Sequence, residues 1–92
     1  MRLTRVDDRP FTQDAIERHV ARLRDLDDAG RLVAAGPLAD GSGGLIIASF
    51  DSMDDAQAWA DAEPFVVDGY ETVDVRAWIP ATRANDYLLD PR

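Results

Sequence analysis

The chain has 92 residues, which allows one small domain. Its formal net charge is −8, from 18 acidic and 10 basic residues, and this balance argues against nucleic acid and anionic membranes as partners, because phosphate groups bind to basic surfaces. The absence of cysteine excludes disulfides, thiolate catalysis and sulfur-ligated metals, and one histidine among scattered acids is a poor metal site, so we expect neither a metal nor a cofactor.

Residues 1–7 are predicted to form a short strand with Leu3 and Val6 as its apolar residues. This segment carries an acidic residue too early for a secretory signal peptide. No run in the sequence is apolar and long enough to cross a bilayer. We therefore expect a cytoplasmic protein.

The next element is predicted to be a helix from about residue 12 to residue 29. Thr12 is the candidate N-cap, and Gly30 is the expected residue just beyond the end, because glycine adopts positive φ without a penalty. His19, the only histidine, lies on the apolar side of this helix. The apolar residues of that side recur at helical spacing: Ile16, Val20, Leu23 and Leu26. Histidine exchanges protons near neutral pH, so any case for catalysis starts at His19.

Two strands over residues 31–37 and 44–50 are predicted to form a hairpin. The residues between them, 39–43, have turn chemistry throughout. Pro37 cannot donate a hydrogen bond to a ladder, so it belongs at a strand end, a bulge or an edge.

A second helix is predicted to start after Ser52, whose side chain can cap it, and to end near Ala62. Pro64 sets this end, because proline disfavours helical torsions at the residue before it. Residues 65–69 then form a turn or a single helical turn.

The last strand is predicted over residues 70–79, with Pro80 ending it. The order β-α-β-β-α-β predicts an α+β fold of the ferredoxin-like type, with both helices on one sheet face. Residues 1–80 would form this domain, and residues 81–92 a C-terminal tail. The open face would carry Trp78, which favours a homodimer through that face over a monomer with a solvated face.

Four segments taken in order resemble the YciI-like (YCII-related) family. They are the helix from His19 to Leu32, the strand Val33–Leu38, the glycine-led strand Gly43–Ala48, and Ser52–Gly69 followed by a strand that ends in Trp78. The resemblance covers roughly residues 1–80. It implies a dimeric α/β-barrel built from ferredoxin-like protomers, and an enzymatic activity that depends on a recurring histidine and aspartate.

Carried over by position, the family histidine is His19. The Asp-Pro-Phe/Tyr motif of the family falls on Glu63, Pro64 and Phe65, so a glutamate replaces the aspartate. The longer side chain keeps the carboxylate and moves it, and a displacement near 1 Å can cost on the order of a hundredfold in rate. Asp8 resembles the acidic exit from the family's first strand and is the second candidate partner of the histidine.

On this interpretation His19 transfers a proton on a small substrate, and Glu63 or Asp8 orients it, as in a lyase or isomerase that needs no cofactor. The expected substrate-binding residues provide backbone amides, an aromatic wall and anion-binding guanidinium groups. They are Gly36, Pro37, Phe65, Arg9 and Arg76.

The alternative is a ligand-binding or dimerisation domain without catalysis. In a dimerisation domain, His19 would lie at the edge of the core and bond only to the backbone. In a ligand-binding domain, the pocket would be open, Glu63 would point to solvent and Asp8 would be distant. Glu63 would then only cap the end of the second helix region, and Asp8 would be a solvated turn residue. An open pocket at His19 with a carboxylate within hydrogen-bonding reach, roughly 2.6–3.2 Å, favours the enzyme.

Overall fold

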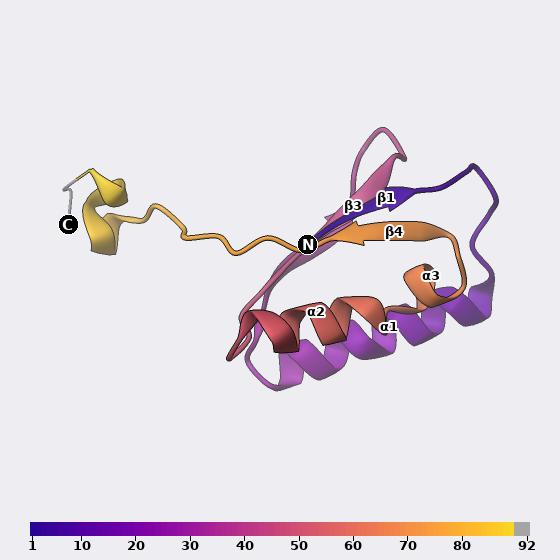
Figure 1. Ribbon diagram of the computed structural model, residues 1–92, viewed down its shortest axis with the longest axis horizontal. Coiled ribbons are helices and arrows are strands. Elements are labelled where there is room, and N and C mark those ends of the chain that lie inside the picture. The colour runs from indigo at the N-terminus through magenta and orange to yellow at the C-terminus, as the bar shows by residue number, and fades with distance from the viewer. Residues whose placement is uncertain (90–92) are drawn as a thin grey trace.

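Strands and helices alternate in the computed structural model, which describes residues 1–89 (Figure 1). In chain order the elements are β1 (Arg2–Arg5), α1 (Gln13–Asp28), β2 (Leu32–Pro37), β3 (Gly43–Ala48), α2 (Met53–Asp61), α3 (Pro64–Val67), β4 (Glu71–Asp74) and the 3-10 helix η1 (Arg83–Leu88). The strands form one sheet in the order β2-β3-β1-β4, and every neighbouring pair is antiparallel. The chain is therefore a small α+β protein. None of the helices among residues 1–89 is long and apolar enough to cross a membrane.

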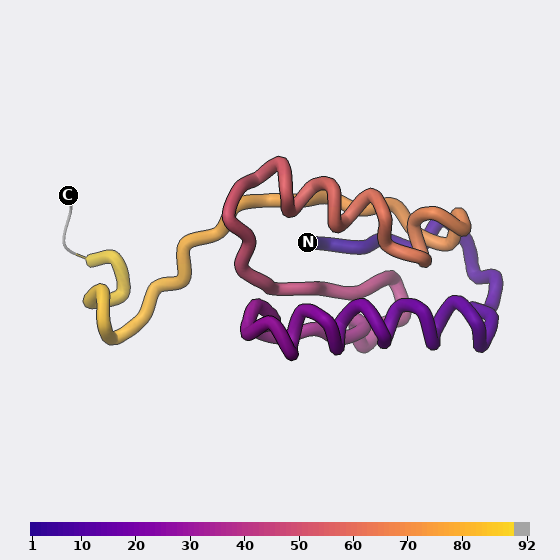
Figure 2. The backbone as a smooth tube through the Cα atoms, turned by 90° about the horizontal axis from the view of Figure 1, so that it is seen from below, coloured from indigo at the N-terminus to yellow at the C-terminus, as the bar shows by residue number. Residues whose placement is uncertain are grey.

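The helices α1, α2 and α3 all lie on one face of the sheet, and Figure 2 shows this layer from its outer side. Helix α1 begins where Thr12 accepts a hydrogen bond from the Ala15 N–H at 3.1 Å. It ends before Gly30, which has a φ of +72°. Both predicted boundaries of this helix are confirmed. The helix buries Ala15 and Leu26 toward the sheet side of the protein.

The hairpin of β2 and β3 contains a glycine that no other residue can replace without strain. Gly43 has a φ of +152°, and a Cβ atom there would lie 1.8 Å from the carbonyl oxygen of Leu3. This close approach brings β3 against β1. Pro37 pairs with Gly44 at the end of β2, as predicted for a residue that cannot continue a ladder.

The second helical region also follows the local sequence signals. Ser52 accepts a hydrogen bond from the Asp55 N–H at 3.0 Å and caps α2. Helix α2 ends at Asp61, and Pro64 occupies the first turn of α3. The single helical turn predicted after residue 64 is therefore confirmed.

The predicted strand over residues 70–79 is wrong in its second half, because β4 ends at Asp74. The last residue pair between β4 and β1 is Asp74 with Arg2, where β1 begins. Beyond this pair no strand among the described residues offers a ladder partner. Residues 75–89 therefore leave the sheet and extend away from it as an arm (Figure 1). The remaining residues of the expected tail, 90–92, lie outside the described part of the chain.

The core lies between the sheet and the helices and is small. Its buried apolar residues are Leu3, Ala15, Leu26, Ile46, Ala56, Ala60, Phe65 and Tyr70. Two acidic residues, Glu63 and Glu71, are buried with them. A buried carboxylate needs a partner or a proton, so Glu63 and Glu71 are the first places to look for a functional site.

Candidate functional site

His19 and Glu63 are joined by a hydrogen bond between Nδ1 of the imidazole and Oε1 of the carboxylate. His19 lies on α1, and Glu63 is the residue that separates α2 from α3. The Glu63 side chain is 1% exposed, whereas the His19 side chain is 18% exposed. Within the pair, the carboxylate is therefore buried in the interior and the imidazole is accessible to solvent.

The backbone of α3 holds the Glu63 carboxylate in place. Glu63 is the N-cap of α3, and its Oε2 atom accepts a hydrogen bond from the Phe65 N–H at 2.6 Å. The other carboxylate oxygen contacts His19. The sequence left two roles open for Glu63, a cap at the end of the second helix and a partner of the histidine. In the structure Glu63 caps the start of α3, since Ala62 ends α2, and it also bonds to His19.

Aromatic packing fixes the plane of the imidazole ring. The rings of His19 and Phe65 stack with centroids 4.4 Å apart and planes 25° apart. Phe65 also stacks on Phe11, with centroids 4.1 Å apart. Because Glu63 and Phe65 are neighbours in the α3 turn, a single short segment orients the histidine by a hydrogen bond and by stacking.

His19 lines a cavity of about 280 Å³ between α1 and the sheet. This volume is close to the lower end of the range of small-molecule sites. Most of the wall is apolar. The lining residues that provide titratable groups, aromatic rings or accessible backbone are His19, Glu71, Phe11, Phe65, Gly36 and Pro37. The structure thus brings three predicted substrate-binding residues, Gly36, Pro37 and Phe65, to the cavity of His19.

Glu71 is a lining residue that the sequence reasoning missed. It is the first residue of β4 and is 6% exposed. Burial raises the pKa of the Glu71 carboxyl, the negative charge of Glu63 raises it further, and Arg5 and His19 lower it. The available signal was strand alternation, since Glu71 shares a face with Val73 on the predicted strand.

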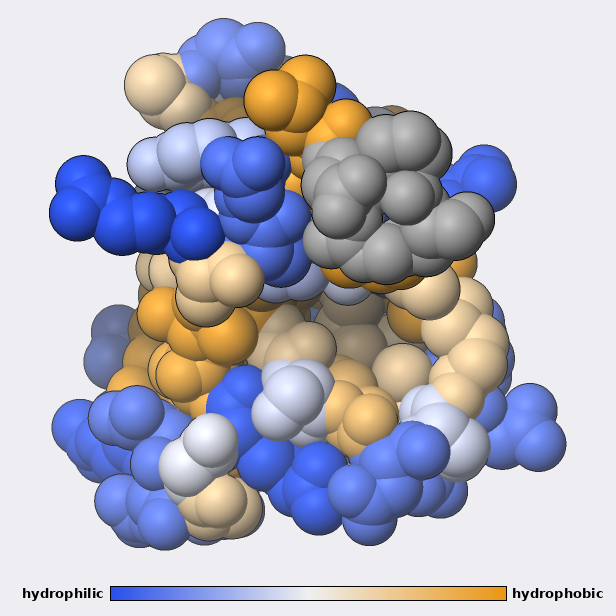
Figure 3. Space-filling model, turned by 90° about the vertical axis from the view of Figure 1, so that its left-hand side faces the viewer, coloured by the Kyte–Doolittle hydropathy of each residue, from blue (hydrophilic) through white to orange (hydrophobic). Residues whose placement is uncertain are grey.

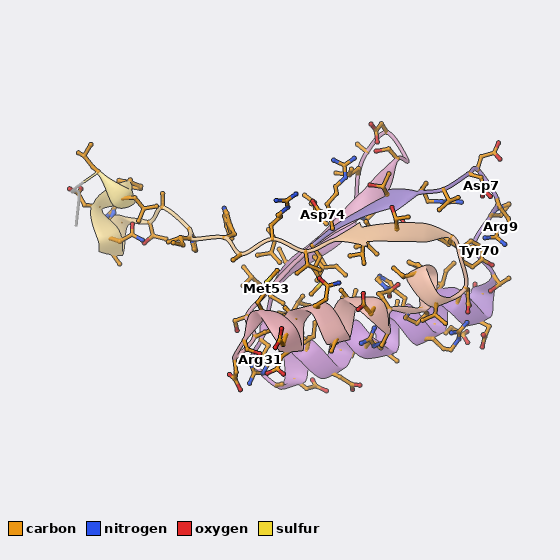
Figure 4. The ribbon with its side chains drawn as sticks, viewed as in Figure 1. Asp7, Arg9, Arg31, Met53, Tyr70 and Asp74 are labelled. Atoms are coloured by element: carbon orange, nitrogen blue, oxygen red, sulfur yellow. The ribbon has the colours of Figure 1, made fainter. Side chains whose placement is uncertain are left out.

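Asp8, Arg9 and Arg76 do not join this cavity. Asp8 is exposed in the connection after β1, and among residues 1–89 no hydrogen bond or ion pair joins it to His19. The guanidinium group of Arg9 lies 4.2 Å from the centre of the Tyr70 ring, at the end of the sheet where Asp7 is labelled in Figure 4.

Arg76 lies near the opposite end of the sheet, where its Nε atom donates a hydrogen bond to Asp74 at 3.1 Å. The expected roles of Asp8, Arg9 and Arg76 at the histidine site are therefore corrected. Their positions depend on a turn or on the ends of the sheet, which the spacing of residues in the sequence does not specify.

A second, more open groove of about 660 Å³ lies between β3, the start of α2 and the residues that follow β4. Apolar residues that line it and remain exposed are Val33, Leu45, Met53 and Trp78. Figure 3 views the molecule from the arm end and shows apolar residues around a central hollow, with hydrophilic residues along the lower edge. This groove contains none of the residues at the His19 cavity except Leu45 and Ile46.

Comparisons with known proteins identify a family, related sequences and a solved structure of similar fold. The family model of the YCII-related domain matches residues 4–79. Protein YciI of Escherichia coli O6:H1 and Protein YciI of Shigella flexneri are each 46% identical to the chain in an alignment of 69 residues. The match covers 63% of this chain and 70% of each relative. Uncharacterized protein YjpA of Bacillus subtilis (strain 168) is 29% identical over 68 residues, covering 74% of this chain and 80% of the relative.

A solved structure with the same fold is 5-chloro-2-hydroxyhydroquinone dehydrochlorinase (TftG) from Burkholderia phenoliruptrix AC1100, in complex with 2,5-dihydroxybenzoquinone. Its TM-score to this chain is 0.60 at 23% sequence identity. The alignment covers 85% of this chain and 91% of the solved chain. At this level of identity the similarity establishes the fold.

Proposed function

The chain belongs to the YCII-related domain family, and from this premise we propose its function. We propose that the protein is a cofactor-independent enzyme that acts on a small molecule by general acid–base catalysis. In this proposal His19 and Glu63 form a catalytic dyad. His19 transfers the proton, and Glu63 orients the imidazole.

One observation carries the proposal. The His19 imidazole lines a cavity, and its Nδ1 atom is hydrogen-bonded to the buried Glu63 carboxylate. This arrangement leaves Nε2 as the ring nitrogen that exchanges a proton with a substrate. A carboxylate on the other nitrogen fixes the tautomer and the orientation of the ring. A histidine that served only the core would bond to a backbone carbonyl and would not line a cavity.

The groups at the cavity support lyase or isomerase chemistry. His19 would remove a proton from a carbon or oxygen atom of the substrate. The electron pair would then either expel a leaving group or move to another atom, which takes up a proton. Phe65 would provide a flat wall for the substrate, and backbone near Gly36 and Pro37 would form the opposite side.

A flat, hydroxylated ring is the substrate class that fits these walls best. Phe11 and Phe65 present aromatic surfaces to a cavity of modest volume. The TftG structure holds 2,5-dihydroxybenzoquinone, a molecule of this class, in the same fold. We therefore place this compound first in a screen of hydroxylated and halogenated aromatic molecules.

The test is turnover by wild type and by His19→Ala across this screen. We expect the variant to lose about 10²–10⁴-fold in kcat, the usual contribution of a positioned acid or base. Arg24→Ala, on the exposed side of the same helix, is the matched control and should keep full activity. Equal turnover in wild type and His19→Ala would reject the dyad. If His19→Ala still bound ligands and wild type never turned them over, the alternative of a ligand-binding domain would replace the proposal.

We also propose that the fold is ferredoxin-like, that residues 1–80 form the domain and 81–92 its tail, and that two copies pair through the uncovered sheet face. The element order and the sheet order β2-β3-β1-β4 support the fold assignment. The expectation that the open sheet face carries Trp78 is wrong, because β4 ends at Asp74 and Trp78 lies on the arm. Its 62% exposure, beside the exposed Leu45 of β3 in the same groove, supports pairing at this end of the sheet. The expected cytoplasmic location is part of this proposal.

A further inference from the structure

Glu71 is a buried carboxyl group that no described residue satisfies. It is 6% exposed and lines the His19 cavity. Among residues 1–89 no hydrogen bond or ion pair involves its side chain. Burial disfavours an ionised carboxylate that no described residue pairs with, so Glu71 is suited to hold a proton and to meet a ligand in the cavity.

Arg5 is the cation that the sheet places opposite Glu71, because the two residues are paired in the ladder of β1 and β4. The Arg5 guanidinium group is engaged elsewhere. It lies 4.2 Å from the centre of the Phe11 ring, and its Nη2 atom donates a hydrogen bond to the carbonyl of Arg9. Its Nε atom is buried without a partner. A purely structural ion pair between Arg5 and Glu71 would have joined these groups, so the Glu71 carboxyl is left facing the cavity.

The two buried glutamates of the cavity region are thus set up for different roles. Glu63 faces two groups that can donate to it, the Phe65 N–H and the His19 ring. Glu71 faces none among the described residues. The protein engages both oxygens of Glu63, whereas the Glu71 carboxyl lines the cavity, where a substrate can meet it.

We propose that Glu71 is the second proton-carrying residue of the site, a neutral carboxyl that donates to a carbonyl or phenolic oxygen of the substrate while His19 acts on another atom of the same molecule. This inference rests on the proposed function. It narrows the substrate to a small molecule with an oxygen acceptor in conjugation with the atom that loses the proton.

The reaction that follows is a tautomerisation in which nothing is oxidised or reduced. His19 takes a proton from the substrate, and the electron pair of the broken bond moves through the conjugated system to the carbonyl oxygen. That oxygen forms a bond to the proton that Glu71 gives up. The substrate has lost one proton and gained one. The proton that His19 holds returns to Glu71 through water before the next turnover.

The surroundings of Glu71 favour the protonated form. Burial is the main cause of its raised pKa, and the negative charge of Glu63 acts in the same direction. The charged or titratable groups that oppose this effect are Arg5 on β1 and His19 on α1. A neutral carboxyl that donates a hydrogen bond is a known device for stabilising charge that develops on a carbonyl oxygen.

A ligand-free experiment tests the protonation of Glu71. The folded protein would keep a proton on Glu71 that the unfolded chain releases above the ordinary pKa of 4.5. Wild type should therefore lose stability as the pH rises from about 4.5 through the raised pKa, and Glu71→Gln should not lose this contribution. Urea denaturation at several pH values should show the variant gaining on wild type as the pH rises. Glu17→Gln, an exposed acid on α1, is the control. A difference between Glu71→Gln and wild type that stays constant with pH would overturn the proposal.

A second experiment tests donation to a ligand, with 2,5-dihydroxybenzoquinone as the probe. Glutamine keeps a donor at this place, whereas leucine removes it. We expect Glu71→Gln to bind the probe within about threefold of wild type and Glu71→Leu to bind it roughly 5–150-fold more weakly, the loss of one buried hydrogen bond. Turnover by both variants should fall about 100-fold or more. If His19→Ala is inactive while Glu71→Leu binds and reacts like wild type, this inference fails and the proposed function stands. If His19→Ala is as active as wild type, the proposed function itself fails.

Discussion

The helix-covered face of the sheet and the open groove differ in how their side chains are satisfied. On the helix-covered face, Glu63 serves the α3 backbone and His19 at once, and the imidazole is stacked on Phe65. Away from that face, Val33 on β2 and Trp78 on the arm are more than half exposed and line an open groove. His19 and Glu63 find their partners within one chain, whereas the groove exposes apolar surface that a second surface would bury.

This difference separates two kinds of constraint. Substitutions on the covered face should change both folding and chemistry, because the same atoms serve both. Substitutions in the groove should leave the single chain almost unaffected and should change only its association with other molecules. The following variants test this contrast, from the largest expected effect on stability to the smallest.

Gly43→Ala should be the most damaging change. The added Cβ atom would lie 1.8 Å from the Leu3 carbonyl oxygen, and the φ of +152° is unfavourable for any side chain. The combined overpacking and backbone strain should cost about 3 kcal/mol or more. Urea denaturation followed by circular dichroism measures this loss. Gly36→Ala is the control in the paired strand, because nothing lies within 4 Å of a Cβ there, and it should cost less than about 1 kcal/mol.

Glu63→Ala should rank second, with a loss of about 2–4 kcal/mol. About 1 kcal/mol of this comes from the N-cap of α3, and the rest from the buried donors that lose their acceptor. Ser52→Ala removes a helix cap whose side chain makes no other hydrogen bond among residues 1–89, and it should cost only about 1 kcal/mol. Equal losses in the two variants, measured by thermal and urea unfolding, would contradict the double role of Glu63.

Trp78→Ala should have the smallest effect on the stability of one chain, within about 0.5 kcal/mol, because the side chain is exposed on the arm. Its effect should appear in analytical ultracentrifugation as a shift from dimer to monomer. Arg83→Ala, also exposed on the arm, is the matched control and should leave the assembly unchanged. A dimer that persists in Trp78→Ala at the dissociation midpoint of wild type would place the interface elsewhere.

The elements with local signals were predictable from the sequence. Thr12 and Ser52 cap helices, and Gly30 follows a helix end, because each of these roles depends on residues within four positions. His19 and Glu63 were expected to be partners from the family resemblance, and the structure joins them by a hydrogen bond. Local rules and one family motif therefore carried most of the fold and the centre of the site.

The remainder depends on tertiary structure. Glu71 is acidic, and hydropathy places such a residue on the surface, so only the alternation of the strand pointed inward. The end of β4 at Asp74 follows from the length of β1, which the composition of residues 75–79 does not encode. Asp8 and Arg9 reach their positions through a turn whose path no periodic pattern describes.

The double attachment of Glu63 affects how relatives of this protein should be judged. A lineage that abandoned the chemistry would be free to replace the histidine, since losing the imidazole removes only one contact of the carboxylate. The acid itself would persist, because the α3 turn still needs its cap. An acidic residue at this position is therefore weak evidence of activity in a relative, and the histidine is the residue to inspect.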